Sequence, residues 1–526
     1  MKVSTTVVQL IVNQEVECSN HSLSAKMEQG VQVRLYFYFF TQNYDRGILM
    51  GKKKGVKVRV TFVGENSCGV TGSCTLVEYG NRKVLLECGL YQSNSLKNDY
   101  EINTRKFKFK AKDIDYVFLN HAHIDHSGLL PRLYKEGCKA QIIATEKTIG
   151  FLPALLKDSA FIMQRDCETL SRNKNVSVLP IYGNEDVSTT LDMLRGYKFN
   201  ELYTLDETFS FMFVPAGHIV GSAQLVLYVK EASGHVQKIL YTSDLGNIKL
   251  KKPYVEPFEK VTKANIVIAE TTYGASDREI GKKDRQNDLN KIKSVILDTC
   301  LYKRGKVLIP SFALDRSQFL LTVLYDMFGK DESFDVPIVV DSPLACKMFK
   351  VYEDNLDEEN KAKFLEVCNW KNVKFISNAD ESKLCVSDGR PKVILSSSGM
   401  LTAGRSVYYS KALLPDQNST ILFCGFASAN SLAYKIKNGD KQKTISIDKK
   451  AYANKCSIVD LKSFSSHIQR EDMLMYYKQI NCSAIYLVHG DMDAKLEFAK
   501  DLKEELTKGC STTKVCVVNK GTSITL

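Results

Sequence analysis

The stretch that decides the fold runs from Tyr116 to His126 and reads Tyr-Val-Phe-Leu-Asn-His-Ala-His-Ile-Asp-His. It begins with an apolar run of the length of a buried β-strand, and its last six residues include three histidines and one aspartate. A lone buried histidine is usually a satisfied core residue, but four such polar side chains in one turn are costly to bury without an ion. Histidine is also the commonest side chain for binding a transition metal. The stretch therefore predicts a metal-dependent hydrolase.

The same pattern, an apolar run that leads to a polar side chain, recurs at later places in the chain. The pairs are 211–214 with His218, 239–241 with Asp244, 266–269 with Glu270, and 484–488 with His489. Runs of this length are expected to be buried strands, and the ends of neighbouring strands meet at one edge of a sheet. Distant parts of the chain are therefore expected to converge on one cleft.

This combination of motifs resembles the β-CASP group of metallo-β-lactamase-fold hydrolases, whose members process RNA or, in one branch, DNA. The resemblance covers roughly residues 56–526. It implies an α/β fold, in which a metallo-β-lactamase αββα sandwich carries an inserted β-CASP α/β domain. The HxHxDH motif alone is less specific, because it also occurs in lactamases, glyoxalases and other small-molecule hydrolases.

The resemblance implies a site for two zinc ions. The first ion is expected on His121, His123 and His218, the second on Asp125, His126 and His489, with Asp244 as the bridge and Asp125 also acting in catalysis. Imidazole and carboxylate ligands suit zinc, although the side-chain types leave manganese or iron open. Two such ions roughly 3.5 to 4 Å apart lower the pKa of a bound water towards ~7 and stabilise charge on a transferring phosphoryl group.

Two further motifs indicate how a leaving ribose oxygen receives its proton. The segment 464–467, Phe-Ser-Ser-His, matches the second cassette motif of the family, and 270–274, Glu-Thr-Thr-Tyr-Gly, matches the first. We expect His467 to be the general acid and Glu270 to orient it and favour its charged form. The alternative for Glu270 is a purely structural role as the cap of a turn.

The third cassette motif and two departures complete the comparison with the family. A histidine at the position of His489 marks the RNA-processing members, whereas the DNA-specific branch carries valine, so we expect RNA, single-stranded, as the substrate. Glu87 stands before Cys-Gly where the family usually has aspartate. The longer carboxylate fits if the local backbone adjusts, and its effect on the geometry behind the metal ligands and on the rate stays open. Asp315 stands where relatives often have glycine, and the sequence offers no functional account of it.

The order of motifs divides the chain into four segments. They are an N-terminal extension of unknown role at 1–55, the first part of the hydrolase core at 56–274, the β-CASP insert at 275–455 and the second part of the core at 456–526. Within the insert, short apolar runs alternate with helical stretches, which is typical of a parallel α/β sheet. One run ends in Ser396, Ser397, Ser398 and Gly399, whose hydroxyls and amides suit a substrate phosphate, although serine-rich turns are common. Since the match begins near Val56, we hypothesise that translation starts at Met50.

Composition agrees with these expectations without deciding them. The net charge of +12, from 72 basic and 60 acidic residues, fits a polyanionic partner. Basic side chains gather at 52–59 and again at 105–112 and could contact phosphates, although a solvated face is the commoner explanation. Fifteen cysteines without a CxxC pair favour reduced thiols in a cytoplasm. The apolar run 35–40 is much shorter than the roughly 20 residues that cross a bilayer.

The favoured function is a zinc-dependent RNA-processing nuclease that hydrolyses phosphodiester bonds. We favour internal cleavage over 5′-3′ exonuclease action, because the core closes at Leu526 with no following domain of the kind that aids dimer formation in some exonucleolytic relatives. A small-molecule metallo-hydrolase and a non-catalytic RNA-binding subunit remain the alternatives. The sequence leaves a homodimer and the identity of the RNA open.

Overall fold

Two seven-stranded sheets form the hydrolase core in the computed structural model, which describes residues 56–93, 95–174, 177–275, 282–425, 427, 431–439 and 444–526. The first sheet has the order β22 (Ser523–Thr525), β1 (Arg59–Phe62), β2 (Thr75–Tyr79), β3 (Arg82–Leu86), β4 (Tyr116–Phe118), β5 (Gln141–Thr145) and β6 (Leu194–Tyr197). The second has the order β21 (Lys514–Val517), β20 (Ala484–Val488), β11 (Ile266–Glu270), β10 (Val236–Tyr241), β9 (Ala223–Lys230), β8 (Phe209–Pro215) and β7 (Tyr203–Thr204). The predicted extension 1–55 and the proposed start at Met50 lie outside the described residues.

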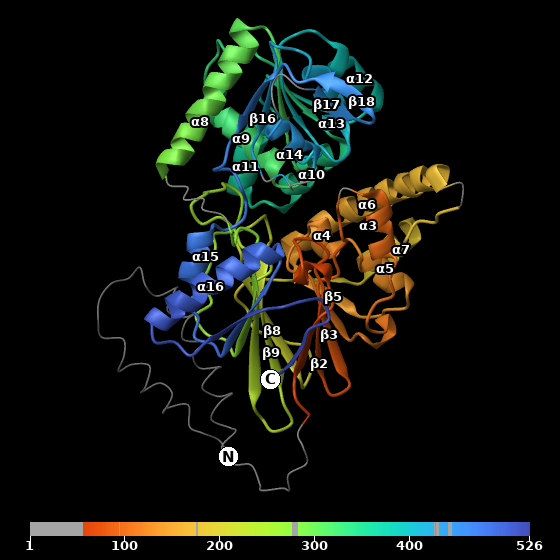
Figure 1. Ribbon diagram of the computed structural model, residues 1–526, viewed down its shortest axis with the longest axis vertical. Coiled ribbons are helices and arrows are strands. Elements are labelled where there is room, and N and C mark those ends of the chain that lie inside the picture. The colour runs from red at the N-terminus through yellow and green to blue at the C-terminus, as the bar shows by residue number, and fades with distance from the viewer. Residues whose placement is uncertain are drawn as a thin grey trace. The chain divides into compact units, whose positions relative to one another are not determined.

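The two sheets pack face to face because successive side chains of their strands point alternately to the core between the sheets and to the helices outside. In β8, Phe211 and Phe213 point into the core between the sheets, while Met212 and Val214 point to the helices on the other face. Phe118 of β4 meets Phe211 across this core with ring centroids 5.0 Å apart. In Figure 1, β2, β3 and β5 lie beside β8 and β9 in this arrangement.

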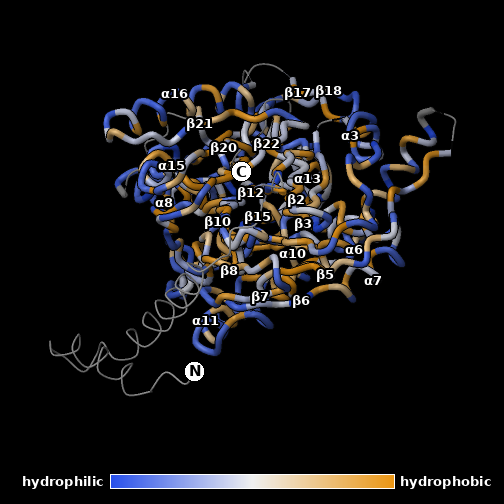
Figure 2. The backbone as a smooth tube through the Cα atoms, turned by 90° about the horizontal axis from the view of Figure 1, so that it is seen from below, coloured by the Kyte–Doolittle hydropathy of each residue, from blue (hydrophilic) through white to orange (hydrophobic). Residues whose placement is uncertain are grey.

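Helices cover the outer face of each sheet. On the first sheet these are α3 (Leu96–Asn103), α4 (Ile124–Ser127), α5 (Leu130–Lys135), α6 (Glu146–Lys174) and α7 (Asn184–Asp192), and on the second they are α15 (Arg470–Tyr477) and α16 (Met492–Lys508). The short 3-10 helices η1 (Glu65–Ser67) and η2 (Ala111–Asp113) lie in loops. This is the predicted αββα sandwich. Hydrophobic positions gather along its strands in Figure 2, while peripheral helices such as α16 are largely hydrophilic.

The segment between β11 and α15 forms a third sheet, which is parallel throughout. Its order is β14 (Val373–Ile376), β13 (Ile338–Asp341), β15 (Lys392–Ser396), β12 (Lys306–Pro310), β16 (Thr420–Phe423) and β19 (Ser457–Asp460). The helices of the segment are α8 (Lys282–Ile296), η3 (Leu297–Tyr302), α9 (Arg316–Phe328), α10 (Pro343–Asn355), α11 (Glu358–Cys368), α12 (Ala379–Ser387), α13 (Arg405–Leu413) and α14 (Leu432–Lys437), and β17 (Thr444–Ile447) pairs with β18 (Lys450–Ala453).

This arrangement agrees with the fold class that the sequence predicts, an α/β insert carried by the sandwich. β19 belongs to the sheet of the insert and lies beyond the predicted domain boundary at 455, so the chain leaves this sheet only after Asp460. The boundaries themselves stay predictions. None of the helices in the described ranges is long and apolar enough to cross a membrane.

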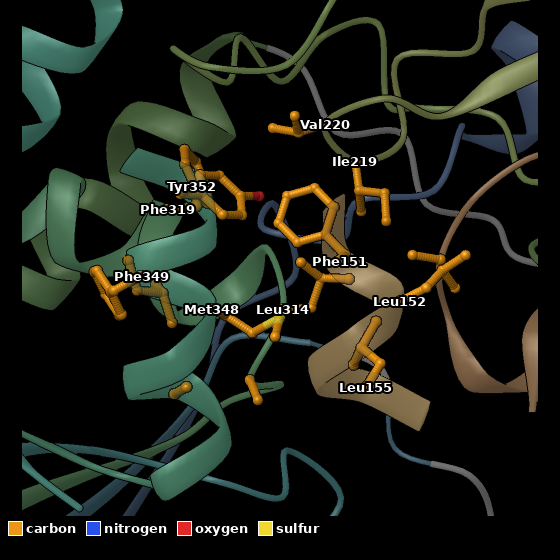
Figure 3. Close-up of a cluster of buried hydrophobic side chains, with 14 of the residues drawn as sticks. Phe151, Leu152, Leu155, Ile219, Val220, Leu314, Phe319, Met348, Phe349 and Tyr352 are labelled. Atoms are coloured by element: carbon orange, nitrogen blue, oxygen red, sulfur yellow. The ribbon is translucent and has the colours of Figure 1, made fainter. Parts of the chain in front are cut away.

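An apolar cluster joins α6 of the core to α10 of the insert. Phe151 of α6 meets Tyr352 of α10 with ring centroids 5.3 Å apart, and Met348 and Leu314 belong to the same cluster (Figure 3). Val220, from the loop after β8, lies at its edge. Burial of these side chains fixes the insert beside the loops that carry the candidate metal ligands.

Candidate metal centre

The first motif leaves β4 and turns sharply into the short helix α4. Asn120 anchors the turn through two hydrogen bonds to Ala223. Its side-chain NH2 donates to the backbone carbonyl of Ala223, and its backbone carbonyl accepts from the backbone amide of Ala223. Gly89 packs directly on α4, and a Cβ there would lie 1.6 Å from the carbonyl oxygen of Asp125. Only glycine fits this approach, which explains the residue that follows Glu87 and Cys88.

Three histidines and one aspartate oxygen form the first ligand group. His123 Nδ1 lies 3.2 Å from His121 Nε2 and 3.4 Å from His218 Nε2. Asp244 Oδ2 lies 3.6 Å from His121 Nε2 and 3.7 Å from His218 Nε2. A Cβ on Gly246 would lie 1.9 Å from the carbonyl oxygen of Gly217, so the loops of Asp244 and His218 touch through glycine.

The other oxygen of Asp244 faces a second group. Asp244 Oδ1 lies 3.4 Å from His126 Nε2 and 3.5 Å from His489 Nε2. Asp125 Oδ2 lies 3.6 Å from His126 Nε2 and 3.7 Å from His489 Nε2. One carboxylate therefore presents a separate oxygen to each ligand group.

The separations between these nitrogen and oxygen atoms suit metal coordination better than hydrogen bonds among the side chains. Zinc bonds of about 2.0 to 2.1 Å in a tetrahedron hold ligand atoms about 3.3 Å apart, close to the separations above. Within the described part of the chain, His126 Nε2, His489 Nε2 and Asp244 Oδ1 are buried without a hydrogen-bond partner. Burial, together with the charge of His126, lowers the pKa of His121 well below its usual value, which favours the neutral imidazole that binds metal.

Glu87 is buried behind the second group and orients its histidine. One of its carboxylate oxygens lies 2.5 Å from His126 Nδ1, on the opposite side of the ring from Nε2. The same oxygen accepts from Ser73 and Tyr241 at 2.6 Å, and the other accepts from Ser243 at 2.7 Å. The longer glutamate is thus fully hydrogen-bonded. Glu87 also adopts a φ of 63°, and Ser243 and His489 share this left-handed conformation, as is common for strained residues at functional sites.

His467 stands beside the first ligand group. Its ring centroid lies 4.5 Å from that of His218, and its Nδ1 lies 3.5 Å from Glu270 Oε1. Glu270 is buried and accepts hydrogen bonds from the amides of Leu245 at 2.6 Å and Thr272 at 3.2 Å. Glu270 therefore caps its turn and also faces His467, and its role in orienting His467 stays a prediction.

The predicted phosphate loop offers fewer free hydroxyls than its sequence suggests. Ser396 donates to the carbonyl of Asp341 at 2.8 Å, and Ser398 bonds within its own turn to Thr402 and Ala403. Ser397 Oγ has no hydrogen-bond partner in the described ranges, and Gly399 lines a small pocket with Phe312 and Arg316. Its role with phosphate stays a prediction.

Several residues of the site carried no recognisable signal in the sequence. Ser73, Tyr241 and Ser243 all bond to Glu87, and Thr272 lies 3.0 Å from His489 Nδ1. Tyr241 and Ser243 come just before the predicted ligand Asp244, and Thr272 lies within the motif 270–274, and these positions are the clues that could have found them. Ser73 lies far from every motif in sequence.

Three protein families match successive segments of the chain. Residues 69–232 match the metallo-beta-lactamase superfamily, 317–436 match the Beta-Casp domain, and 452–513 match the Zn-dependent metallo-hydrolase RNA specificity domain. The metal ligands and His467 lie in the first and third matches or in the core segment between the first and second.

Curated relatives match over most of the chain. Ribonuclease TTHA0252 of Thermus thermophilus is 31% identical over 440 residues, which are 82% of this chain and 93% of the relative. Transcription termination factor FttA of Methanocaldococcus jannaschii is 28% identical over 86% of this chain and 70% of its own length. Endoribonuclease YSH1 of Candida glabrata is 27% identical over 80% of this chain, and the match spans 53% of that relative. The sandwich, its insert, the grouped ligands and these matches together show that the chain belongs to the β-CASP group of the metallo-β-lactamase superfamily.

Proposed function

We propose that this protein is a zinc-dependent ribonuclease that hydrolyses phosphodiester bonds in RNA. The observation that carries the proposal is Asp244, whose two carboxylate oxygens face two separate groups of buried nitrogen and oxygen ligands. A small-molecule hydrolase would not need the insert beside this centre. A non-catalytic RNA-binding subunit would not need the full set of ligands.

The ligand groups are suited to two zinc ions. His121, His123 and His218 would hold one ion, Asp125, His126 and His489 would hold the other, and Asp244 would bridge them. When bound, the ions would supply the activated water and the positive charge that phosphodiester hydrolysis needs. Glu87 keeps His126 in the tautomer that leaves Nε2 free, because Nδ1 is directed to the Glu87 carboxylate.

His467 is suited to deliver the proton that the leaving ribose oxygen requires. Its Nδ1 faces Glu270, so Nε2 is the atom left to reach the substrate. Its side chain is 21% exposed, whereas that of Glu270 is 1% exposed, which matches a donor at the surface of the site held by a buried carboxylate. Glu270 would stabilise the charged imidazole before the transfer.

Three features support RNA as the substrate, and the name of one relative supports internal cleavage as the mode; single-stranded RNA is the form we propose. The match at 452–513 carries the description of an RNA specificity domain and includes His467 and His489. Two of the relatives are named ribonuclease and endoribonuclease. The exposed side chains of Lys106, Lys108 and Lys110 offer positive charge for a phosphate backbone. None of the cysteines in the described ranges forms a disulfide, which suits the reducing cytoplasm proposed from the sequence.

The test combines metal analysis with cleavage of labelled RNA. The purified protein should contain two zinc ions per chain, and removing them with a chelator should abolish cleavage until zinc is restored. Single-stranded RNA with a blocked 5′ end should give internal fragments at the same rate as unblocked RNA. Cleavage that requires a free 5′ end would point to an exonuclease, and an intact RNA with zinc-loaded protein would refute the proposal.

A further inference from the structure

A buried ion pair links the insert to the hydrolase core next to His467. The Lys252 ammonium, in the loop between β10 and β11, lies 2.7 Å from Asp315 Oδ2 at the start of α9. The two side chains are 3% and 5% exposed. A pair this deep in the protein is stable only when additional hydrogen bonds satisfy both charges.

Those additional bonds lead to two motifs of the candidate site. Lys252 donates to Ser466 Oγ at 2.9 Å and to the backbone carbonyl of His218. Ser466 in turn donates to Asp315 Oδ2 at 3.1 Å. One ammonium thus contacts the loop of a metal ligand, the residue before His467 and the carboxylate of the insert.

Arg316 makes a second contact between the insert and the loop that contains Ser466. Its guanidinium donates to Ser466 Oγ at 3.2 Å and to the carbonyl oxygens of Phe464 and Cys424. Arg316 and Lys252 therefore place two positive charges around Ser466, and the Asp315 carboxylate pairs with Lys252 there. Tyr352 Oη lies 3.4 Å from the other oxygen of Asp315.

The backbone of Asp315 shows why this residue is unusual. Its φ of 70° lies in the left-handed region, which glycine adopts without strain. This chain carries a charged side chain there, although glycine would relieve the backbone. The contacts of the Asp315 carboxylate give this chain a reason to keep it.

We propose that the Asp315–Lys252 pair positions His467 for proton transfer by holding its loop against the loop of His218. Asp315 neutralises Lys252, Lys252 fixes Ser466, and Ser466 sets the register of the next residue. That register is visible in two backbone bonds, from Asn247 to the carbonyl of Ser466 at 2.9 Å and from Ile468 to the carbonyl of Leu245 at 2.8 Å. The inference rests on the proposed function of His467. It means that residues of the insert help to position this general acid.

The first experiment is the variant Asp315→Gly, which suits the backbone and removes the side chain that carries the carboxylate. It should keep its zinc and lose roughly 10- to 100-fold in kcat on RNA, the scale of a small misplacement of a catalytic group. The loss should shrink on bis(para-nitrophenyl) phosphate, whose leaving group scarcely needs a proton. In the double variant with His467→Ala, Asp315→Gly should cause no further loss, because both changes act through one group.

The second experiment measures the stability of the His467 loop and does not depend on enzyme activity. Hydrogen exchange of peptides that contain Asn247 and Ile468 should be faster in Asp315→Gly than in wild type, with and without zinc. Asp206→Asn is the matched control, since it breaks the ion pair of Asp206 with Arg82 away from the site and should leave both peptides unchanged. If Asp315→Gly folds poorly, the double variant Lys252→Met/Asp315→Gly removes both charges and should show the same fast exchange.

The outcomes separate this inference from the proposed function. Wild-type protein that does not cut RNA refutes the function, while the exchange data still decide whether the pair holds the loop. Unchanged exchange in both variants would overturn the inference. An equal loss of activity on RNA and on the nitrophenyl ester would also overturn it, because the pair would then be merely structural.

Discussion

Asp244 is the residue on which both ligand groups depend. Because each of its oxygens faces a different group, Asp244→Ala should remove a ligand from both ions at once. We expect zinc content and RNA cleavage to fall together in this variant, as measured by elemental analysis and by a cleavage assay. Two tightly bound ions in Asp244→Ala would show that the bridging assignment is wrong.

His467 differs from Asp244 in the kind of loss it should cause. His467→Ala should keep its zinc and lose roughly 10²- to 10⁴-fold in cleavage rate, the range for losing general acid catalysis. The deficit should be smaller on a substrate with a better leaving group. An equal deficit on both substrates, or a loss of zinc, would exclude the role of general acid.

Changing Glu87 tests whether its contact with His126 contributes to zinc affinity. Glu87→Gln replaces the carboxylate that faces His126 Nδ1 with an amide and leaves the hydroxyls of Ser73 and Tyr241 without their charged acceptor. We expect zinc affinity of the second group to fall about 10- to 100-fold, the usual cost of losing such a partner. Glu87→Asp, which restores the residue usual in the family, is the informative control. Wild-type zinc affinity in Glu87→Gln would refute this role.

At the scale of elements, the contact of α6 with α10 fixes the insert beside the core. Phe151 is fully buried in this contact, whereas Phe161 on the same helix is 59% exposed. We expect Phe151→Ala to lower the free energy of unfolding by about 3 to 5 kcal/mol, as for other buried phenylalanines. Phe161→Ala should change it by less than about 0.5 kcal/mol. Urea denaturation of the two variants checks both values, and similar losses would contradict the assigned packing.

The strands and local motifs of this fold could be predicted because their signals lie within a few neighbouring residues. The apolar run before His121 predicts β4, and the spacing from His121 to His126 predicts grouped ligands. The partners of Asp315 could not be predicted, because Lys252 and Ser466 are distant in sequence and no local pattern connects them. The same reason hid Ser73 from the sequence.

At the scale of the whole molecule, positive charge lies close to the metal centre. Arg105 is 3.7 Å from Glu65 of η1, and the carbonyl of Asn66 in the same helix accepts from the amide of His489. The exposed lysines at 106, 108 and 110 follow directly in the chain. This places a basic surface within one short helix of the proposed ligands.

Reversing those charges should weaken RNA binding. We expect the triple change of Lys106, Lys108 and Lys110 to glutamate to raise KM and to reduce the salt dependence of binding by about 0.7 in log-log slope per lost phosphate contact. The same change at the exposed lysines 500, 503 and 508 of α16 keeps the net charge equal and serves as the control. Equal effects of the two triple variants would mean that general charge, and not this surface, attracts RNA.

The proposed ligands of the centre lie far apart in the sequence, so the ribosome makes them at different times. His121 is made early, but His489 and His467 follow only after the whole insert, and β20 must then enter the second sheet beside β11. A nascent chain still on the ribosome therefore lacks one proposed ligand, the proposed general acid and the strand β20. On the proposed function, the chain would not cut its own message until these later segments have been made. A stop codon before His467 would likewise release an inert fragment and not an unregulated nuclease.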